Sequence, residues 1–378
     1  MLRRLLLAAI LSLPCVPVVA CPFCGNLRPT LAQQIDRADA AVLGDLLSSD
    51  GTSRTLRVRH VFKPKGRFSP NAAIEIGSPP RAEGAAREGS LLLALRMGNA
   101  AAGSKDSEWT TVELNEASYA YLARSPGPSA PPAKRLAYFL DFLEHVDPLI
   151  AEDAYLEFGR APFDEIAKLA DRLPVDHLRD LLADETVPPE RKGLYGLLLG
   201  LAGVKQQRGD VAADFWQAIT APTNDFRSGF DGILGGYLWL GKTAALERLA
   251  ERYLDDPQAA VGDVRHLMAA LRVYHDYGRD IPADDLLRVY RRLLDRPAVA
   301  AAVAGDLRRW RDWQALDKVA SLFGRAGYDD PSIERSVAGY LLACPLPAAQ
   351  RQVARLRKLI PERVAEAERL EAEETGGK

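Results

Sequence analysis

The stretch SPGPSAPP, residues 125–132, divides this sequence into two parts that have different hydrophobic periods. Four of its eight residues are proline, which has no amide hydrogen to donate within a helix or a central strand. The stretch therefore predicts an extended, semi-rigid linker over residues 124–133, with one domain before it and another after it.

On the N-terminal side of the linker, short apolar runs alternate with polar positions, as is typical of half-buried strands. We expect strands at residues 40–47, 55–63, 72–76, 90–95, 109–114 and 119–122. The fourth of these is apolar on both faces and should be central. Thr30 and Gln33 have the spacing of a capping box, which predicts a short helix over residues 30–38. A small β-barrel over residues 21–123 fits this number and length of strands.

On the C-terminal side, apolar residues recur every three to four positions, which indicates helices. Many short helices with short connections predict an α-solenoid over residues 134–370, with a disordered tail at 371–378. An irregular helical bundle is the alternative. The expected fold class is thus multidomain β + α, a small barrel followed by an all-α solenoid.

Residues 1–20 have the pattern of an export signal, with two arginines near the start, an apolar run over residues 5–13 and Ala20 before Cys21. The apolar run has half the length that a bilayer span needs. Ordinary signal peptidase would cut after Ala20, but residues 18–21 also resemble a lipobox, in which case Cys21 would carry lipid. Both routes predict a periplasmic or extracellular protein, tied to a membrane only through lipidation of Cys21.

Cys21 and Cys24 form a CxxC pair for which several uses stay open. A local disulfide or a structural role is favoured over a redox pair, because neither a βαβ context nor an immediate helix start accompanies the motif. A zinc site needs two more ligands, and no second CxxC or histidine pair lies nearby. Cys344 follows an apolar helical pattern and is expected to be a buried small hydrophobe.

No pattern in the sequence assembles a catalytic site, so we expect no enzyme and no cofactor. Residues 236–243 match the phosphate-loop expression GxxxxGKT, but their bulky apolar residues continue a helix. We therefore interpret Gly232, Gly235 and Gly236 as positions that allow close helix approach, and Gly241 as the end of that helix.

The charge balance excludes partners that are recognised by a strong overall field. Lysine and arginine number 49 and aspartate and glutamate 51, for a net charge of -2, which predicts neither nucleic acid nor an anionic membrane surface as partner. Arg57, Arg59 and Lys63, with Arg54 and Lys65 nearby, form a basic stripe on the second strand. Phe62 is the one aromatic residue close enough for base stacking, and it is expected to point inward, so a charged edge that resists aggregation explains the stripe better.

One cluster in the helical part has the residue types of an interface hot spot, namely Arg308, Arg309, Trp310, Arg311 and Trp313. Helical spacing favours the two tryptophans as core, and an exposed interface is the other interpretation. We expect an exported, non-catalytic interaction or scaffold protein that binds a protein partner in the cell envelope through its helical repeats. A thiol-dependent or metal-dependent accessory factor acting through Cys21 and Cys24 is the alternative.

The first domain resembles the netrin-like family, which includes the tissue inhibitors of metalloproteinases. The resemblance rests on a cysteine motif, a short helix, the run ADAAVLG at 38–44 and a strand that ends HVFK at 60–63. It implies an OB-type barrel, and a metalloenzyme inhibitor that would use the amine and carbonyl of Cys21. The chain has CPFC where the inhibitors have Cys-x-Cys, and lipidation would block the amine. The helical part looks like HEAT-type repeats, and the whole is similar to exported bacterial proteins that begin CPFC.

Overall fold

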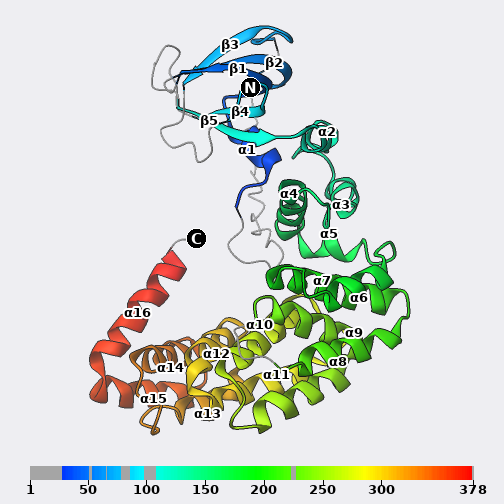
Figure 1. Ribbon diagram of the computed structural model, residues 1–378. Helices are drawn as coiled ribbons and strands as arrows, with labels where there is room; N and C mark the ends of the chain where they lie inside the picture. Colours follow the sequence, from blue (N-terminus) through cyan, green and yellow to red (C-terminus); the bar gives the residue numbers. More distant parts are fainter. Residues whose placement is uncertain are drawn as a thin grey trace, which may run out of the picture. The chain divides into compact units, whose positions relative to one another are not determined.

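The computed structural model describes residues 28–50, 53–64, 66–77, 86–97, 108–222 and 227–376. Contacts divide the chain into two compact units, Met1–Ile166 and Ala167–Lys378. Figure 1 labels the helices and strands of both units. Within the described residues, no helix is long and apolar enough to span a membrane.

The first part of the chain contains a sheet and short helices: α1 (Leu31–Arg37), β1 (Ala40–Ser49), β2 (Ser53–Lys63), β3 (Ala73–Gly77), β4 (Leu91–Met97), β5 (Glu108–Leu114), α2 (Glu116–Arg124), α3 (Pro132–Leu140), α4 (Pro148–Gly159) and α5 (Phe163–Ala167). The second part is helical: α6 (Val175–Ala183), α7 (Pro189–Lys205), η1 (Gly209–Val211), α8 (Ala212–Thr220), α9 (Phe230–Ala250), η2 (Glu251–Asp255), α10 (Val261–Tyr277), α11 (Ala283–Arg292), η3 (Leu293–Asp295), α12 (Pro297–Arg309), η4 (Trp313–Ala315), α13 (Leu316–Ala320), α14 (Pro331–Ala343), α15 (Pro347–Leu359) and α16 (Pro361–Gly376). A β part followed by an α part is the coarse order that the hydrophobic periods predict.

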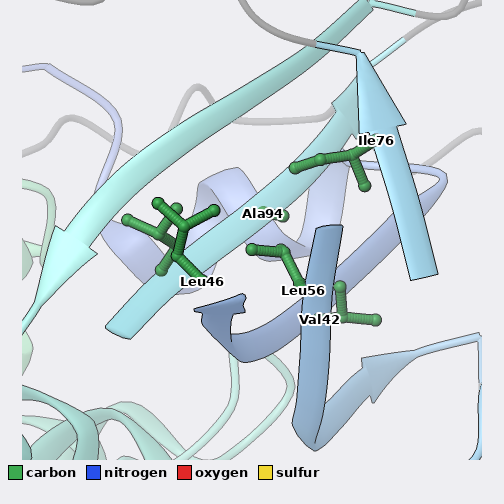
Figure 2. Close-up of a cluster of buried hydrophobic side chains, with 6 residues drawn as sticks. Val42, Leu46, Leu56, Ile76 and Ala94 are labelled. Atoms are coloured by element: carbon green, nitrogen blue, oxygen red, sulfur yellow. The ribbon is translucent and has the colours of Figure 1, made fainter. Parts of the chain in front are cut away.

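In the described part of the first unit, the strands form one five-stranded antiparallel sheet with the order β3-β2-β1-β4-β5. Five of the expected strands are confirmed, and β4 has two neighbours, as its apolar faces predict. Side chains from four strands meet on one face and form a buried core, as Figure 2 shows for most of them: Val42, Leu46, Leu56, Ile76, Leu92 and Ala94.

Arg54 of β2 donates from Nη1 to Thr111 Oγ1 of β5 at 2.8 Å, although β1 and β4 lie between these two strands in the sheet. This contact shows that the sheet is curled. Arg54 is only 5% exposed and belongs to the inner face of β2, so the expectation that it adds to the basic stripe was wrong. The stripe residue Arg59 pairs with Asp45 and Glu116 at 2.8 and 2.6 Å, and Lys65 lies outside the described residues.

The expected sixth strand, residues 119–122, was wrong because these residues lie in helix α2. Asn115 caps this helix by accepting from the amide of Ser118, while the Ser118 hydroxyl accepts from the amide of Asn115. This reciprocal cap starts the helix. The sequence of α2 is too short for its hydrophobic period to distinguish a helix from a strand. The capping box of Thr30 and Gln33 at α1 is confirmed.

The proline-rich stretch is a compact turn between α2 and α3, and it lies inside the first unit. The amide of Ala130 donates to the carbonyl of Gly127 at 2.9 Å, and Pro132 occupies the first position of α3. Tyr138 of α3 contacts Tyr121 of α2 through its ring and donates its hydroxyl to the Tyr121 carbonyl at 2.7 Å, so the connection between α2 and α3 is not extended.

In the second unit, each long helix packs chiefly on the next helix or the next but one, as in the pairs α7 with α9, α9 with α10, α12 with α14, and α14 with α16. Asp330 caps α14 by accepting from the amide of Ser332. Cys344 is 3% exposed, which confirms its expected burial. Helix α16 continues to Gly376, where a disordered tail was expected.

Glycine residues allow a close contact between two helices of the second unit. Gly232 and Gly236 of α9 lie against the backbone of α7, which confirms their predicted role in close approach. The helix expected to end at Gly241 breaks at the next residue, Lys242, whose φ is 51°. The GxxxxGKT match therefore spans a helix and a kink rather than a loop after a strand.

Candidate functional site

The predicted site residues fall into two groups with different outcomes. Cys21 and Cys24 lie outside the described residues. The arginine–tryptophan cluster lies at the C-terminal end of α12 and in the turn after it.

The turn after α12 has the hydrogen bonds of a Schellman motif. The amide of Asp312 donates to the carbonyl of Leu307 at 2.9 Å, and the amide of Arg311 donates to the carbonyl of Arg308 at 3.0 Å. Arg311 occupies the left-handed position with φ 57°, where glycine is the usual residue. The backbone thus ends the helix abruptly and leaves the Arg311 side chain exposed.

Trp310 is half-buried and held between aromatic neighbours from two other helices. Its ring stacks on His275 of α10 at 3.8 Å between centroids, and it meets Tyr290 of α11 edge-on at 4.6 Å. The indole Nε1 is buried and has no hydrogen-bond partner among the described residues. Trp313 is also half-buried and contacts Tyr340 edge-on. The tryptophans therefore serve mainly as packing groups.

Two buried aspartates, Asp306 and Asp312, pair with arginines of neighbouring helices and so hold this turn in place. Asp306 accepts from Arg272 and from the hydroxyl of Tyr290. Burial and then the Asp306 carboxylate raise the pKa of Tyr290 well above its usual value, which keeps the phenol protonated as a donor.

Asp312 forms a two-pronged pair with Arg291 of α11, at 2.6 and 2.7 Å, and its own carbonyl accepts from the Tyr340 hydroxyl at 2.6 Å. Such paired, planar contacts hold the turn in one orientation.

The arginines of the cluster face different surroundings. The side chain of Arg309 is 55% exposed, and its guanidinium lies 5.7 Å from the centroid of Trp310. Arg311 is exposed as well. Arg308 instead lines a cavity of about 120 Å³ together with Arg335, next to the small residues Gly305 and Gly339. We call Arg309, Trp310 and Arg311 the arginine edge.

Sequence reasoning missed a second polar site, which lies in the first unit. Asp153 of α4 is 5% exposed; its Oδ1 accepts from the amide of Leu31 at 2.6 Å and its Oδ2 from the Tyr121 hydroxyl at 2.8 Å. Burial raises the pKa of Asp153 to about 6. One turn later on the same helix, the buried Glu157 pairs with Arg135 of α3. The signal in the sequence is two carboxylates four residues apart in an otherwise apolar helix.

Among the described residues, no group of three or more histidine, cysteine, aspartate or glutamate side chains is arranged to hold a metal ion. Comparisons of the chain with family models, with curated proteins and with solved structures gave no match. The site is therefore interpreted from its own geometry.

Proposed function

We propose that the protein is an exported, non-catalytic interaction protein whose helical unit binds a protein partner of the cell envelope through the arginine edge. The observation that carries this proposal is Arg311, a long cationic residue in a left-handed position that glycine would occupy without strain. Backbone strain of this kind gathers at binding and switch sites.

Rigidity also supports binding at the arginine edge. The ring of Trp310 packs against His275 and Tyr290, so the exposed arginines on either side of it are attached to an ordered segment. A preordered surface loses less conformational freedom when a partner binds. Exposed guanidinium groups favour a partner that presents carboxylates, which they bind in a planar, two-pronged manner.

The finer architecture belongs to the same proposal. We interpret the curled sheet as an OB-type barrel similar to netrin-like domains, supported by the reach of Arg54 to Thr111 and by the approach of β3 to β5. We interpret the helices from α6 onward as a HEAT-like solenoid, supported by their contacts between each helix and the next but one.

The test is capture of a partner from an envelope extract by the full chain, compared with Arg309→Ala and Arg311→Ala. Each substitution should weaken the free energy of binding to the captured partner by about 1 to 2 kcal/mol. The matched control is Arg351→Ala with Arg355→Ala, two exposed arginines of α15, which should leave the affinity unchanged.

Cys21→Ser and Cys24→Ser variants complete the experiment. Capture that disappears with the cysteines but ignores Arg309 and Arg311 would replace this proposal with the thiol-dependent alternative. Mass spectrometry of the mature protein tests the export step, and the first residue should be Cys21.

A further inference from the structure

The first unit contains a cavity of about 180 Å³ that the proposed function does not use. Its walls come from three places: the turn before α3 together with the first residues of α3, the end of α4 with the residues after it, and Gln33 of α1. Pro128, Pro132, Leu136 and Pro162 supply apolar wall. The same proline-rich turn that connects α2 to α3 therefore forms one side of a small pocket.

Glu157 lines this cavity with a carboxylate that is almost fully buried, its side chain being 4% exposed. One oxygen, Oε2, pairs with Arg135. The other, Oε1, is buried and has no hydrogen-bond partner among the residues that the structure describes. A buried carboxylate oxygen without a donor carries a desolvation cost that a bound donor would relieve.

The other charged groups that line the pocket among the described residues, Arg135 and Arg160, are both cationic. Arg135 is 15% exposed at its side chain, and Arg160 donates from Nε to the carbonyl of Arg28 at 3.2 Å. Among the described residues that line the pocket, Glu157 is the one carboxylate, and it lies there with the two arginines.

This charge pattern selects among small ligands. A simple ammonium ion would satisfy Glu157 but would meet the repulsion of two arginines. A simple carboxylate would suit the arginines but would leave Oε1 of Glu157 without a donor. A zwitterion with an apolar side chain satisfies both conditions and matches the proline and leucine walls.

We infer that this cavity, which we call the Glu157 pocket, binds a free α-amino acid with an aliphatic side chain. Its ammonium group donates to Oε1 of Glu157, its carboxylate lies toward Arg135 and Arg160, and its side chain contacts the proline walls. No bond is made or broken. The pocket is thus a small-molecule site in addition to the protein-binding function proposed for the helical unit.

Calorimetric titration of the full chain with L-leucine, L-valine and L-proline tests this inference. At least one should bind, and propylamine and propionate, which each carry one of the two charges, should bind about tenfold more weakly or worse. Propylamine that binds as well as the amino acid would overturn the role of the arginines. Absence of binding by all three amino acids would overturn the inference and leave an ordered water as the partner of Glu157.

Two variants locate the site. Glu157→Gln should weaken binding about tenfold, because a neutral amide replaces the charged acceptor. Ala130→Leu should weaken it as well by narrowing the cavity without a change in charge, which keeps the test valid if Glu157→Gln fails to fold. Glu152→Gln, at a more exposed position of the same helix, is the control and should bind as wild type does. Binding that survives both Glu157→Gln and Ala130→Leu would place the ligand elsewhere.

Discussion

Gly200 of α7 lies against Gly236 of α9 so closely that a Cβ atom on Gly200 would come within 2.4 Å of the Gly236 Cα atom. The contact is one of a series along both helices, in which a Cβ on Gly232 would come within 2.1 Å of the Gly193 carbonyl oxygen. Glycine at these positions lets the two helices pack backbone to backbone, at a distance that no side chain permits.

Gly236→Ala should therefore destabilise the protein by about 3 kcal/mol, because the new methyl group would overlap the Gly196 carbonyl oxygen and the helices would have to separate. The measurement is the free energy of unfolding from urea denaturation. Gly305→Ala in α12 is the control, since a Cβ there meets no atom within 4 Å. That substitution should raise the free energy of unfolding by about 0.5 to 1 kcal/mol. Equal effects of the two substitutions would contradict the packing argument.

This pair also shows how far the sequence alone could go. Glycine spacing in residues 232–236 predicts close helix approach, and the structure confirms it. The partner helix α7 could not be predicted, because helix pairing depends on contacts between residues that are distant in the chain. The same reason explains why Glu157 was missed, since the partner of this buried carboxylate is Arg135, which lies 22 residues earlier.

Short polar–apolar runs were the other source of error. The apolar pattern of residues 119–122 fits a strand as well as a helix. The structure has a helix there, which the reciprocal cap of Asn115 and Ser118 starts. The cluster of arginine and tryptophan was visible in the sequence, but its division into packed rings and exposed cations depends on His275 and Tyr290 from other helices.

Arg311→Gly should stabilise the protein by about 1 kcal/mol, because glycine adopts the left-handed conformation without the steric cost that a Cβ atom adds. The side chain that is removed is exposed, so little packing is lost. The thermal midpoint should rise, while capture of the partner should weaken as for Arg311→Ala. A fall in the thermal midpoint would show that the arginine side chain supports the fold, and would weaken the case for a binding role.

Asp153 should make the stability of the first unit depend on pH. Burial raises its pKa from 3.8 to about 6 in the folded protein, so the folded state binds this proton more tightly than the unfolded chain does. The resulting stabilisation is complete below pH 3.8 and is lost as the pH rises through about 6. A shift of this size corresponds to about 3 kcal/mol.

Asp153→Asn should abolish this dependence, because the amide stays neutral while its oxygen can still accept from the amide of Leu31. Urea midpoints measured from about pH 4 to about pH 8 should decline for the wild type and stay nearly level for the variant. The variant should therefore be the more stable of the two above pH 6. Asp36→Asn, at an exposed carboxyl of α1, is the control and should keep the wild-type decline. A variant that is less stable than wild type at pH 8 would show that the ionised carboxylate is needed.

Arg54 is a cation enclosed by the sheet, and the one hydrogen-bond partner of its side chain among the described residues, Thr111, is neutral. It is 5% exposed, Nη1 donates to Thr111, and Nε has no hydrogen-bond partner among the described residues. Removal of a charge from water is costly when no opposite charge accompanies it, and apolar replacements of buried charges are often stabilising. Arg54→Met, which keeps much of the aliphatic stem, should therefore raise the free energy of unfolding by about 1 to 3 kcal/mol. Arg57→Met, an exposed position on the outer face of the same strand, should change it by less than about 0.5 kcal/mol. Loss of stability in Arg54→Met would instead mean that the bond to Thr111, which joins β2 to β5, contributes more to the curled sheet than the enclosed charge costs.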